Sequence, residues 1–332
     1  MIFNKNNKGN EELRTLTGSY YKSNDFNKIE VKVTLASEEL ISIIGNEIFV
    51  KALVHYTGVN YQVEEPSPAL ALLDQLVQYM QLPISFLATL WHYQGNDISH
   101  EDSGRKMKID ATSEKMAWEW MYDRDDAAAL RNYQRALDRL IKFLNDNVGS
   151  FPEWADSDAR KETLSLFINT WEHFNRLFAI DNSPAFFLRL APIMKEIERK
   201  HIKPILGLEK FTELKTLIKA GEELTAANQE WYDTVCDPIP LLTMAKAVKR
   251  FSVTVLPEGV VQQFFSQFQQ AKANQPVTMD QVKYVSKDLY ADGIEVINEL
   301  KKYWSALNVD ESDQSIDDLI PGGETTDKFM SL

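Results

Sequence analysis

The chain has 332 residues, of which 44% are hydrophobic, and it carries a formal net charge of −13 at pH 7. This length and apolar content suffice for two domains of ordinary size, whereas the acidic balance disfavours nucleic acid or anionic lipid bound along a broad face, because like charges repel. The longest apolar runs are shorter than the roughly 18 to 20 residues that span a bilayer, and the first residues contain no apolar signal segment, so we expect a soluble protein that is not exported.

The single cysteine excludes an internal disulfide and a cysteine-based zinc cluster. Cys236 has no basic neighbour close in sequence, which favours a packed thiol over a nucleophile. The sequence contains no glycine-rich phosphate loop, GxSxG, HExxH or EF-hand pattern. Catalysis would have to rest on scattered carboxylates and histidines, so we predict neither an enzyme nor a cofactor.

At the N-terminus, residues 1–30 are polar and rich in asparagine. We expect an extended or partly ordered arm that something else must hold. The next residues, VKVTL at 31–35, alternate like a short strand. A helix is then expected to open at Ser37 and to stop near Gly45.

An apolar helix is expected from Pro68 to Tyr93, where large apolar side chains recur every three or four residues. Pro83 lies inside this segment and predicts a kink or a break into two helices, because proline lacks a backbone donor and clashes one turn back. The helical pattern ends after Gly95.

A long amphipathic helix is expected from Asp123 to Asn145. Asp123, Asp125 and Asp126 lie at its start, where acids satisfy backbone N–H groups and oppose the helix dipole; a DxD-like ion site is the alternative. The turn-rich stretch VGSFPEWADSDAR follows, and we place the boundary between two domains there.

A second helical series begins at Lys161 and closes with a helix that opens at Thr278. Thr278 and Gln281 form a capping-box pattern, in which each side chain bonds the backbone N–H of the other residue. The last 25 residues contain seven acids and one lysine. This composition is typical of an acidic tail that is disordered or becomes ordered on a partner.

The two halves repeat one order of elements. Pro83 and Pro238 each interrupt an apolar helix, Gly104 and Gly259 each follow in a non-helical segment, and both pairs are separated by 155 positions. A long amphipathic helix comes next in each half. This order indicates a degenerate tandem duplication, although short apolar strings also match by chance.

We therefore predict a mostly α protein with two tandem small helical bundles, each with a β-hairpin or extended loop before its last helix. The predicted division is an N-terminal arm at 1–30, a first domain at 31–149, a second domain at 150–307 and an acidic flexible tail at 308–332.

Both loops are candidate interaction sites, because a two-stranded ribbon is marginally stable alone and needs neighbouring strands or another surface. The charges of the first loop, in SHEDSGRKMKID, would contact a neighbouring chain, and Gly104 would supply the turn. The first site comprises Ser99, His100, Glu101, Asp102, Ser103, Gly104, Arg105, Lys106 and Lys108. The second comprises Val253, Val255, Pro257, Glu258 and Gly259.

Two further groups of side chains have alternative interpretations. Histidines and carboxylates concentrate at His92, His100, Glu101 and Asp102. A metal would need three or four of them to converge, so we favour a solvated turn and predict no metal site. Trp118 and Trp120 are either core residues or exposed interface anchors.

A resemblance to a known family rests on three stretches: ELISIIGNEIFVKALVHY, LPISFLATLWHYQGNDISHEDSGRKMKID and MAWEWMYDRDDAAALRNYQRALDRLIKFL. They look like a domain family of unassigned function found in the genomes of tailed phages and prophages. In its order of elements, each half also resembles the helical head–tail connector (adaptor) proteins of tailed phages. Those proteins form a ring beneath the portal and carry a hairpin or extended loop before the final helix. SHEDSG at 99–104 is similar to that loop, whereas TVLPEG at 254–259 departs from it.

The resemblance implies a structural virion protein, a ring of many subunits between portal and tail, without catalysis. The implied partners are further copies of the chain, the portal protein and tail or neck proteins, with DNA passing through the ring and neither sequence-specific nucleic acid nor membrane bound. The implied location is the virion, and the host cytoplasm during assembly. The alternative is a non-viral helical interaction or scaffold protein without catalysis.

Overall fold

The computed structural model describes residues 1–18, 20, 25–101, 104–107, 118–220, 224–251, 253–256, 259–262 and 278–313. Packing divides the chain into two compact units: the first runs from Met1 to Ala191, and the second comprises Pro192–Val261 and the chain from Thr278 onward. Most described residues are helical, so the mostly α prediction is confirmed. None of the described helices has the length and apolar character needed to cross a membrane.

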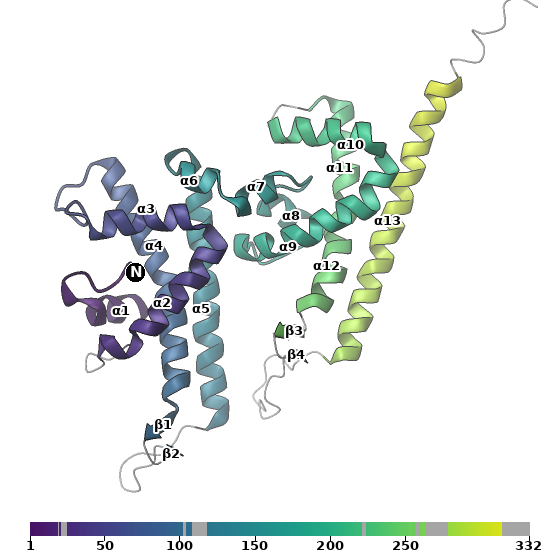
Figure 1. The fold of residues 1–332 in the computed structure, drawn as a ribbon. Coiled ribbons are helices and arrows are strands. Elements are labelled where there is room, and N and C mark those ends of the chain that lie inside the picture. Colours follow the sequence, from purple (N-terminus) through teal and green to yellow (C-terminus); the bar gives the residue numbers. More distant parts are fainter. Residues whose placement is uncertain are drawn as a thin grey trace, which may run out of the picture. The chain divides into compact units, whose positions relative to one another are not determined.

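The first unit is built around three long helices, in which α2 and α5 each pack on α4 (Figure 1). Helix α3 packs against α4. The elements in chain order are η1 (Lys5–Asn7), α1 (Gly9–Thr17), α2 (Phe26–Ile44), α3 (Asn46–Thr57), α4 (Pro68–Asn96), β1 (Ile98–Glu101), β2 (Gly104–Met107), α5 (Glu119–Asp146), η2 (Val148–Ser150), α6 (Pro152–Ala155), α7 (Asp158–Leu164), α8 (Trp171–Leu177) and α9 (Pro184–Ile197), the end of which belongs to the second unit.

Helix α2 includes residues 31–35, so the strand expected there is wrong. Val33 is fully buried, whereas Val31 and Leu35 are 66% and 44% exposed. The apolar residues that alternate in the sequence therefore lie on different sides of a helix. The buried side of this helix consists of residues spaced three and four apart. Asp25 starts the helix, because its side chain accepts a hydrogen bond from the backbone N–H of Asn27 at 3.1 Å.

Helix α4 runs through Pro83 without a break. A proline inside a helix costs about 3 kcal/mol or more. Met80, Ile84 and Leu87 are buried on both sides of the proline, and each fully buried apolar side chain contributes about 1.5–3 kcal/mol. Packing on α2 and α5 thus holds the two halves of α4 in one helix.

Part of the segment expected to be an arm packs into the first unit. Ile2, Phe3 and Leu13 are buried in its core. The Tyr56 hydroxyl of α3 donates a hydrogen bond to Glu12 Oε1 at 2.6 Å and accepts one from the Lys5 N–H at 2.7 Å. Burial raises the pKa of Glu12, and the hydrogen bond from Tyr56 opposes that rise. We call Lys5, Glu12 and Tyr56 the N-terminal clip.

The second unit is built around α12 and α13, which lie side by side (Figure 1). Its elements are the end of α9, η3 (Glu198–Ile202), α10 (Lys203–Ala220), α11 (Ala226–Cys236), α12 (Pro238–Phe251), β3 (Val253–Leu256), β4 (Gly259–Gln262) and α13 (Met279–Asp313). The interruption predicted before Pro238 is confirmed, since α11 ends at Cys236 and α12 begins at Pro238.

Helices α12 and α13 approach closely at Gly293. A Cβ atom at this position would lie 2.7 Å from Leu242, so a larger residue would force the helices to move. Ser286 Oγ donates a hydrogen bond across the contact to the Ala245 carbonyl at 2.6 Å. The predicted capping box starts α13, because the Thr278 N–H donates to Gln281 Oε1 at 2.9 Å and the Gln281 N–H donates to Thr278 Oγ1 at 3.3 Å.

The repeated order of elements extends to their bounds. Strands β3 and β4 begin and end 155 positions after β1 and β2, the separation that the sequence gives for Pro83 and Pro238. Helix α4 ends 155 positions before the end of α12, and a long helix follows each pair of strands. The chain is therefore a tandem repeat.

Candidate interaction surface

Strands β1 and β2, which contain the described residues of the first predicted site, come after the end of α4 and before the start of α5 (Figure 1). The two strands are antiparallel, and their register places Ser99 opposite Lys106, His100 opposite Arg105 and Glu101 opposite Gly104. These six residues are thus brought together by their backbones. Asp102, Ser103 and Lys108 are outside the described residues.

In the second predicted site, Val253 and Val255 lie in β3 and Gly259 lies in β4. Strands β3 and β4 are neighbours in one two-stranded sheet. Pro257 and Glu258 are outside the described residues.

The two tryptophans considered as possible anchors, Trp118 and Trp120, are exposed. Trp118 immediately precedes α5 and is 70% exposed, while Trp120 and Met121 are each 40% exposed. Large apolar side chains seldom gather on the surface without a role in contacts. Exposure is what an interface anchor requires, and the role of anchor stays a prediction.

Two of the side chains near this end, His92 and Asp126, have local partners. The Asn96 side chain donates to the His92 carbonyl at 2.8 Å and lies 3.1 Å from His92 Nε2. Helix α5 begins at Glu119, so Asp123, Asp125 and Asp126 lie beyond its first turn and do not cap it as expected. Gln94 instead donates to Asp126 at 2.8 Å and ties α4 to α5. Among the described residues, no three potential ligands gather around a metal position.

In the second unit, three cations surround one carboxylate. Glu196 in α9 accepts from Lys200 at 2.6 Å, from Lys246 at 3.0 Å and from Arg250 at 2.6 Å. These hydrogen bonds hold the pKa of the Glu196 carboxyl well below its ordinary range, and the bond from Lys200 has the largest effect. We call these four residues the Glu196 hub. Lys246 and Arg250 lie near the end of α12 that precedes β3.

A second ion pair lies deeper in the same unit. Lys215 Nζ is 2.5 Å from Glu198 Oε2, and Glu198 is only 3% exposed. Glu198 opens η3, a π-helical turn that widens the helix. Burial lowers the pKa of Lys215, while Glu198 opposes that change. The pair is too buried for contact with a partner and is best explained as internal packing.

Cys236 is fully buried, as its prediction as a packed thiol requires. Burial raises its pKa well above the ordinary value, and a neutral thiol is a poor nucleophile. The sequence prediction of a packed thiol is confirmed.

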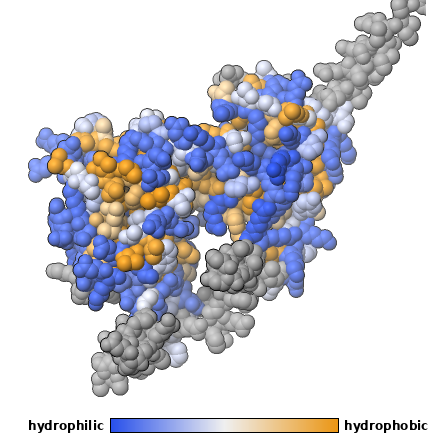
Figure 2. Space-filling model, viewed as in Figure 1, coloured by the Kyte–Doolittle hydropathy of each residue, from blue (hydrophilic) through white to orange (hydrophobic). Residues whose placement is uncertain are grey.

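Apolar patches lie between hydrophilic residues on the visible face of the first unit (Figure 2). The exposed apolar side chains of α2 and α3 include Val31, Leu35, Val50 and Val54. Each helix spaces its pair by four residues, so each pair lies on one side of its helix. Neither pair shows which chain would cover it.

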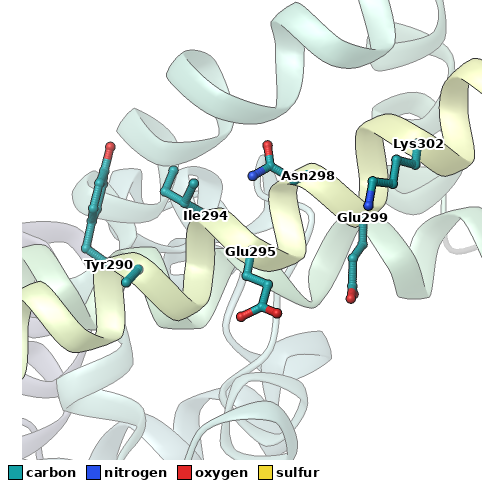
Figure 3. A pocket seen from close by; sticks show the side chains of 7 residues that line it. Tyr290, Ile294, Glu295, Asn298, Glu299 and Lys302 are labelled. Carbon is teal, nitrogen blue, oxygen red and sulfur yellow. The ribbon is translucent and has the colours of Figure 1, made fainter.

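A depression of about 490 Å³ lies along α13. Figure 3 shows Tyr290, Ile294 and Asn298 on one side of the helix and Glu295 and Glu299 on the other. All of its lining residues belong to α13. A depression lined by a single helix is a place for contact with another chain and does not enclose a small ligand.

The Glu196 hub has no counterpart among the residues singled out from the sequence. Lys246 and Arg250 are 50 and 54 positions from Glu196, and only the fold brings them together. The one local signal is a run of bases in α12 without an acid, in KAVKR at 246–250.

The chain matches the model of one protein family, at two places. A model described as a family of unknown function (DUF6712) matches residues 31–163 and, a second time, residues 202–315. The first match contains α4, β1, β2 and α5, and the second contains α12, β3, β4 and α13. No curated protein and no solved structure matches the chain.

Proposed function

We propose, from the premise that this chain belongs to the family of unknown function DUF6712, that it is a structural virion protein. In this proposal it is a head–tail connector, or adaptor, that forms a ring between the portal and the tail of a tailed phage. It carries out no catalysis and holds no cofactor. It is assembled in the host cytoplasm and remains in the virion.

The observation that carries the proposal is the pair of two-stranded sheets at equivalent positions of the repeat. Each strand is four residues long, and a two-stranded ribbon of this size is marginal in water. Its outer edges have unpaired backbone groups that accept a further strand. We propose that the two β-hairpins are arms that pair with adjacent subunits.

The exposed tryptophans support the same proposal. Trp118 and Trp120 lie next to the arm formed by β1 and β2 along the chain, and tryptophan is enriched among residues that dominate binding energy. Two equivalent arms on one chain provide two contacts to neighbouring copies. A contact between different surfaces of neighbouring copies generates a ring if its rotation closes.

The proposed partners are further copies of the chain, the portal protein and tail or neck proteins. DNA would pass through the ring without sequence-specific contacts, and no membrane takes part. The alternative, a non-viral scaffold, shares the helical architecture but requires no closed ring and no affinity for a portal.

The test is negative-stain imaging and mass photometry of the full chain, alone and with a candidate portal ring. We expect closed rings of one size, or a complex with the portal. The variant Trp118→Ser/Trp120→Ser is expected to lose the rings, whereas Tyr284→Ser, which alters an exposed aromatic residue of α13, keeps them. The strand variant Val255→Asp is expected to behave like the tryptophan variant.

If the chain stays monomeric at high concentration and does not bind the portal ring, the connector proposal is ruled out and the scaffold alternative is favoured. Surface substitutions change stability by no more than about 0.5 kcal/mol, so unchanged thermal unfolding separates a lost contact from a lost fold.

A further inference from the structure

The Glu196 hub has more positive than negative charge. One carboxylate accepts hydrogen bonds from Lys200, Lys246 and Arg250, so two positive charges remain after one is neutralised. Lys200 and Arg250 have side chains that are 53% and 51% exposed. An incoming anion can therefore reach these two side chains from solvent, and each of them carries several hydrogen-bond donors.

The surroundings of the hub are also positive. His201 follows Lys200 directly in η3, and its ring packs edge-on against Tyr290 of α13 with 6.4 Å between centroids. Burial lowers the pKa of His201, and Lys246, Lys200 and Lys301 lower it further. A positive field of this kind contrasts with the net charge of −13 on the whole chain and attracts anions to this part of the second unit.

The chemistry of the hub favours carboxylates. Glu196 shows that these three cations accommodate a carboxylate with hydrogen bonds of 2.6–3.0 Å. The chain itself supplies a matching ligand, because residues 308–332 contain seven acids and one lysine. We propose that the acidic C-terminal segment of a second copy of this chain binds Lys200, Lys246 and Arg250 of the hub.

Most of the acids in residues 308–332 are too far along the chain's own helix α13 to bind the hub of the same copy. His201 contacts Tyr290, and α13 continues from there to Asp313, a rise of roughly 35 Å at 1.5 Å per residue. Residues 310, 311 and 313 lie near that far end of α13. Asp317 and Asp318 extend at most about 18 Å beyond it. Five of the seven acids therefore cannot reach their own hub, whereas those of another copy can.

Nucleic acid is the competing ligand class. Phosphates also bind lysine and arginine, but a duplex presents charge along its whole length and would meet the negative field of the rest of the chain. A short acidic peptide needs only the hub. The observations therefore favour the peptide, and the experiment includes DNA as a competitor.

The test measures the fluorescence anisotropy of a labelled peptide with the sequence of residues 308–332, titrated with the full chain. The hub variant Lys246→Ala/Arg250→Ala retains the Lys200–Glu196 pair. Its matched control, Lys283→Ala/Lys287→Ala, removes the same charge from exposed positions of α13. We expect the hub variant to bind the peptide about tenfold more weakly, with no more than a small change in the control.

Three further measurements make the result specific. Added salt is expected to weaken binding, because it screens exposed charges. A peptide with its seven acids changed to amides is expected not to bind. Lys246→Arg/Arg250→Lys, which keeps both charges, is expected to retain binding, and so separates a lost charge from a disturbed fold.

Equal affinities for the hub and control variants would overturn the proposal. Displacement of the peptide by a short DNA duplex at lower concentration than by unlabelled peptide would also overturn it, in favour of nucleic acid. The proposed tail contact rests on the self-association in the proposed function. The experiments nevertheless distinguish failure of the tail contact from failure of the connector proposal. Rings without peptide binding at the hub refute only the tail contact, and peptide binding without rings or portal binding refutes only the connector.

Discussion

The two units of this chain share a topology but differ in what stabilises them. In each, a helix that ends at a pair of short strands packs on a long final helix. The first unit adds an N-terminal segment whose hydrogen bonds meet on Tyr56. The second adds ion pairs on two neighbouring glutamates, Glu196 and Glu198. The repeat thus conserves the placement of the strands, while each copy has acquired its own internal supports.

The largest expected difference comes from the buried ion pair of the second unit. Lys215→Met leaves the Glu198 carboxylate buried without its cation, and we expect the free energy of unfolding of this unit to fall by about 3–5 kcal/mol. Hydrogen exchange followed by mass spectrometry, read on the peptides of α10 to α12, measures the loss. The double variant Glu198→Gln/Lys215→Met removes both charges and should recover most of it. A loss below 1 kcal/mol in the single variant would mean that water reaches Glu198.

The final helices provide a matched pair of core positions. Leu140 in α5 and Leu300 in α13 are both fully buried. We expect Leu140→Ala and Leu300→Ala each to lower the free energy of unfolding of its own unit by about 2–5 kcal/mol, through lost burial and a cavity. Hydrogen exchange should localise each change. Loss of protection in both units from one substitution would show that the repeats unfold together, contrary to their separate cores.

The N-terminal clip has a smaller expected effect, confined to the first unit. Tyr56→Phe removes the donor to Glu12 and the acceptor for the Lys5 N–H, which should cost about 1–3 kcal/mol. Faster hydrogen exchange in residues 2–13 would report it. Tyr284→Phe, at a position that is 71% exposed, is the control and should leave exchange unchanged.

The smallest expected effect is a difference in acid sensitivity. The pKa of Glu196 is lowered from its ordinary value of 4.5 in the folded state, so its contribution is full above that pH and is lost as pH falls through the lowered pKa. The pKa of Glu12 is raised from 4.5, so the folded first unit binds the proton more readily and the clip gains stability as pH falls. Between pH 6 and 3, urea unfolding should show the second unit weakening by at most about 1 kcal/mol relative to Glu196→Gln. An identical pH profile in that variant would contradict this account.

Local patterns in the sequence were sufficient for several elements. The Thr278–Gln281 capping box, the end of α2 before Gly45 and the break before Pro238 all depend on neighbouring residues, and each is present. The prediction for residues 31–35 failed because Val33 packs inward while its neighbours remain exposed, and a short alternating run does not record the longer helical spacing that includes it.

The remaining features depend on contacts distant in sequence. Nothing near Pro83 indicates that packing on two other helices keeps α4 continuous. The polar residues of 1–17 conceal the buried Ile2 and Leu13, whose partners lie in later helices. For the candidate sites, the order of elements was enough to recognise the tandem repeat, while the role of the two loops stays a prediction. The sequence is compatible with both a buried and an exposed Trp118, and only the fold brings together the members of the hub, which are far apart in the chain.

The buried cysteine makes this protein a convenient subject for labelling. Cys236 is the single thiol of the chain and is fully buried in the second unit, so a maleimide added to the folded protein has no accessible target until that unit opens. The rate of modification therefore counts opening events of one repeat and not of the other. A cysteine introduced at Trp118, which is 70% exposed, can receive a fluorophore in the native chain without first removing Cys236, and two such labelled copies would report on assembly through energy transfer.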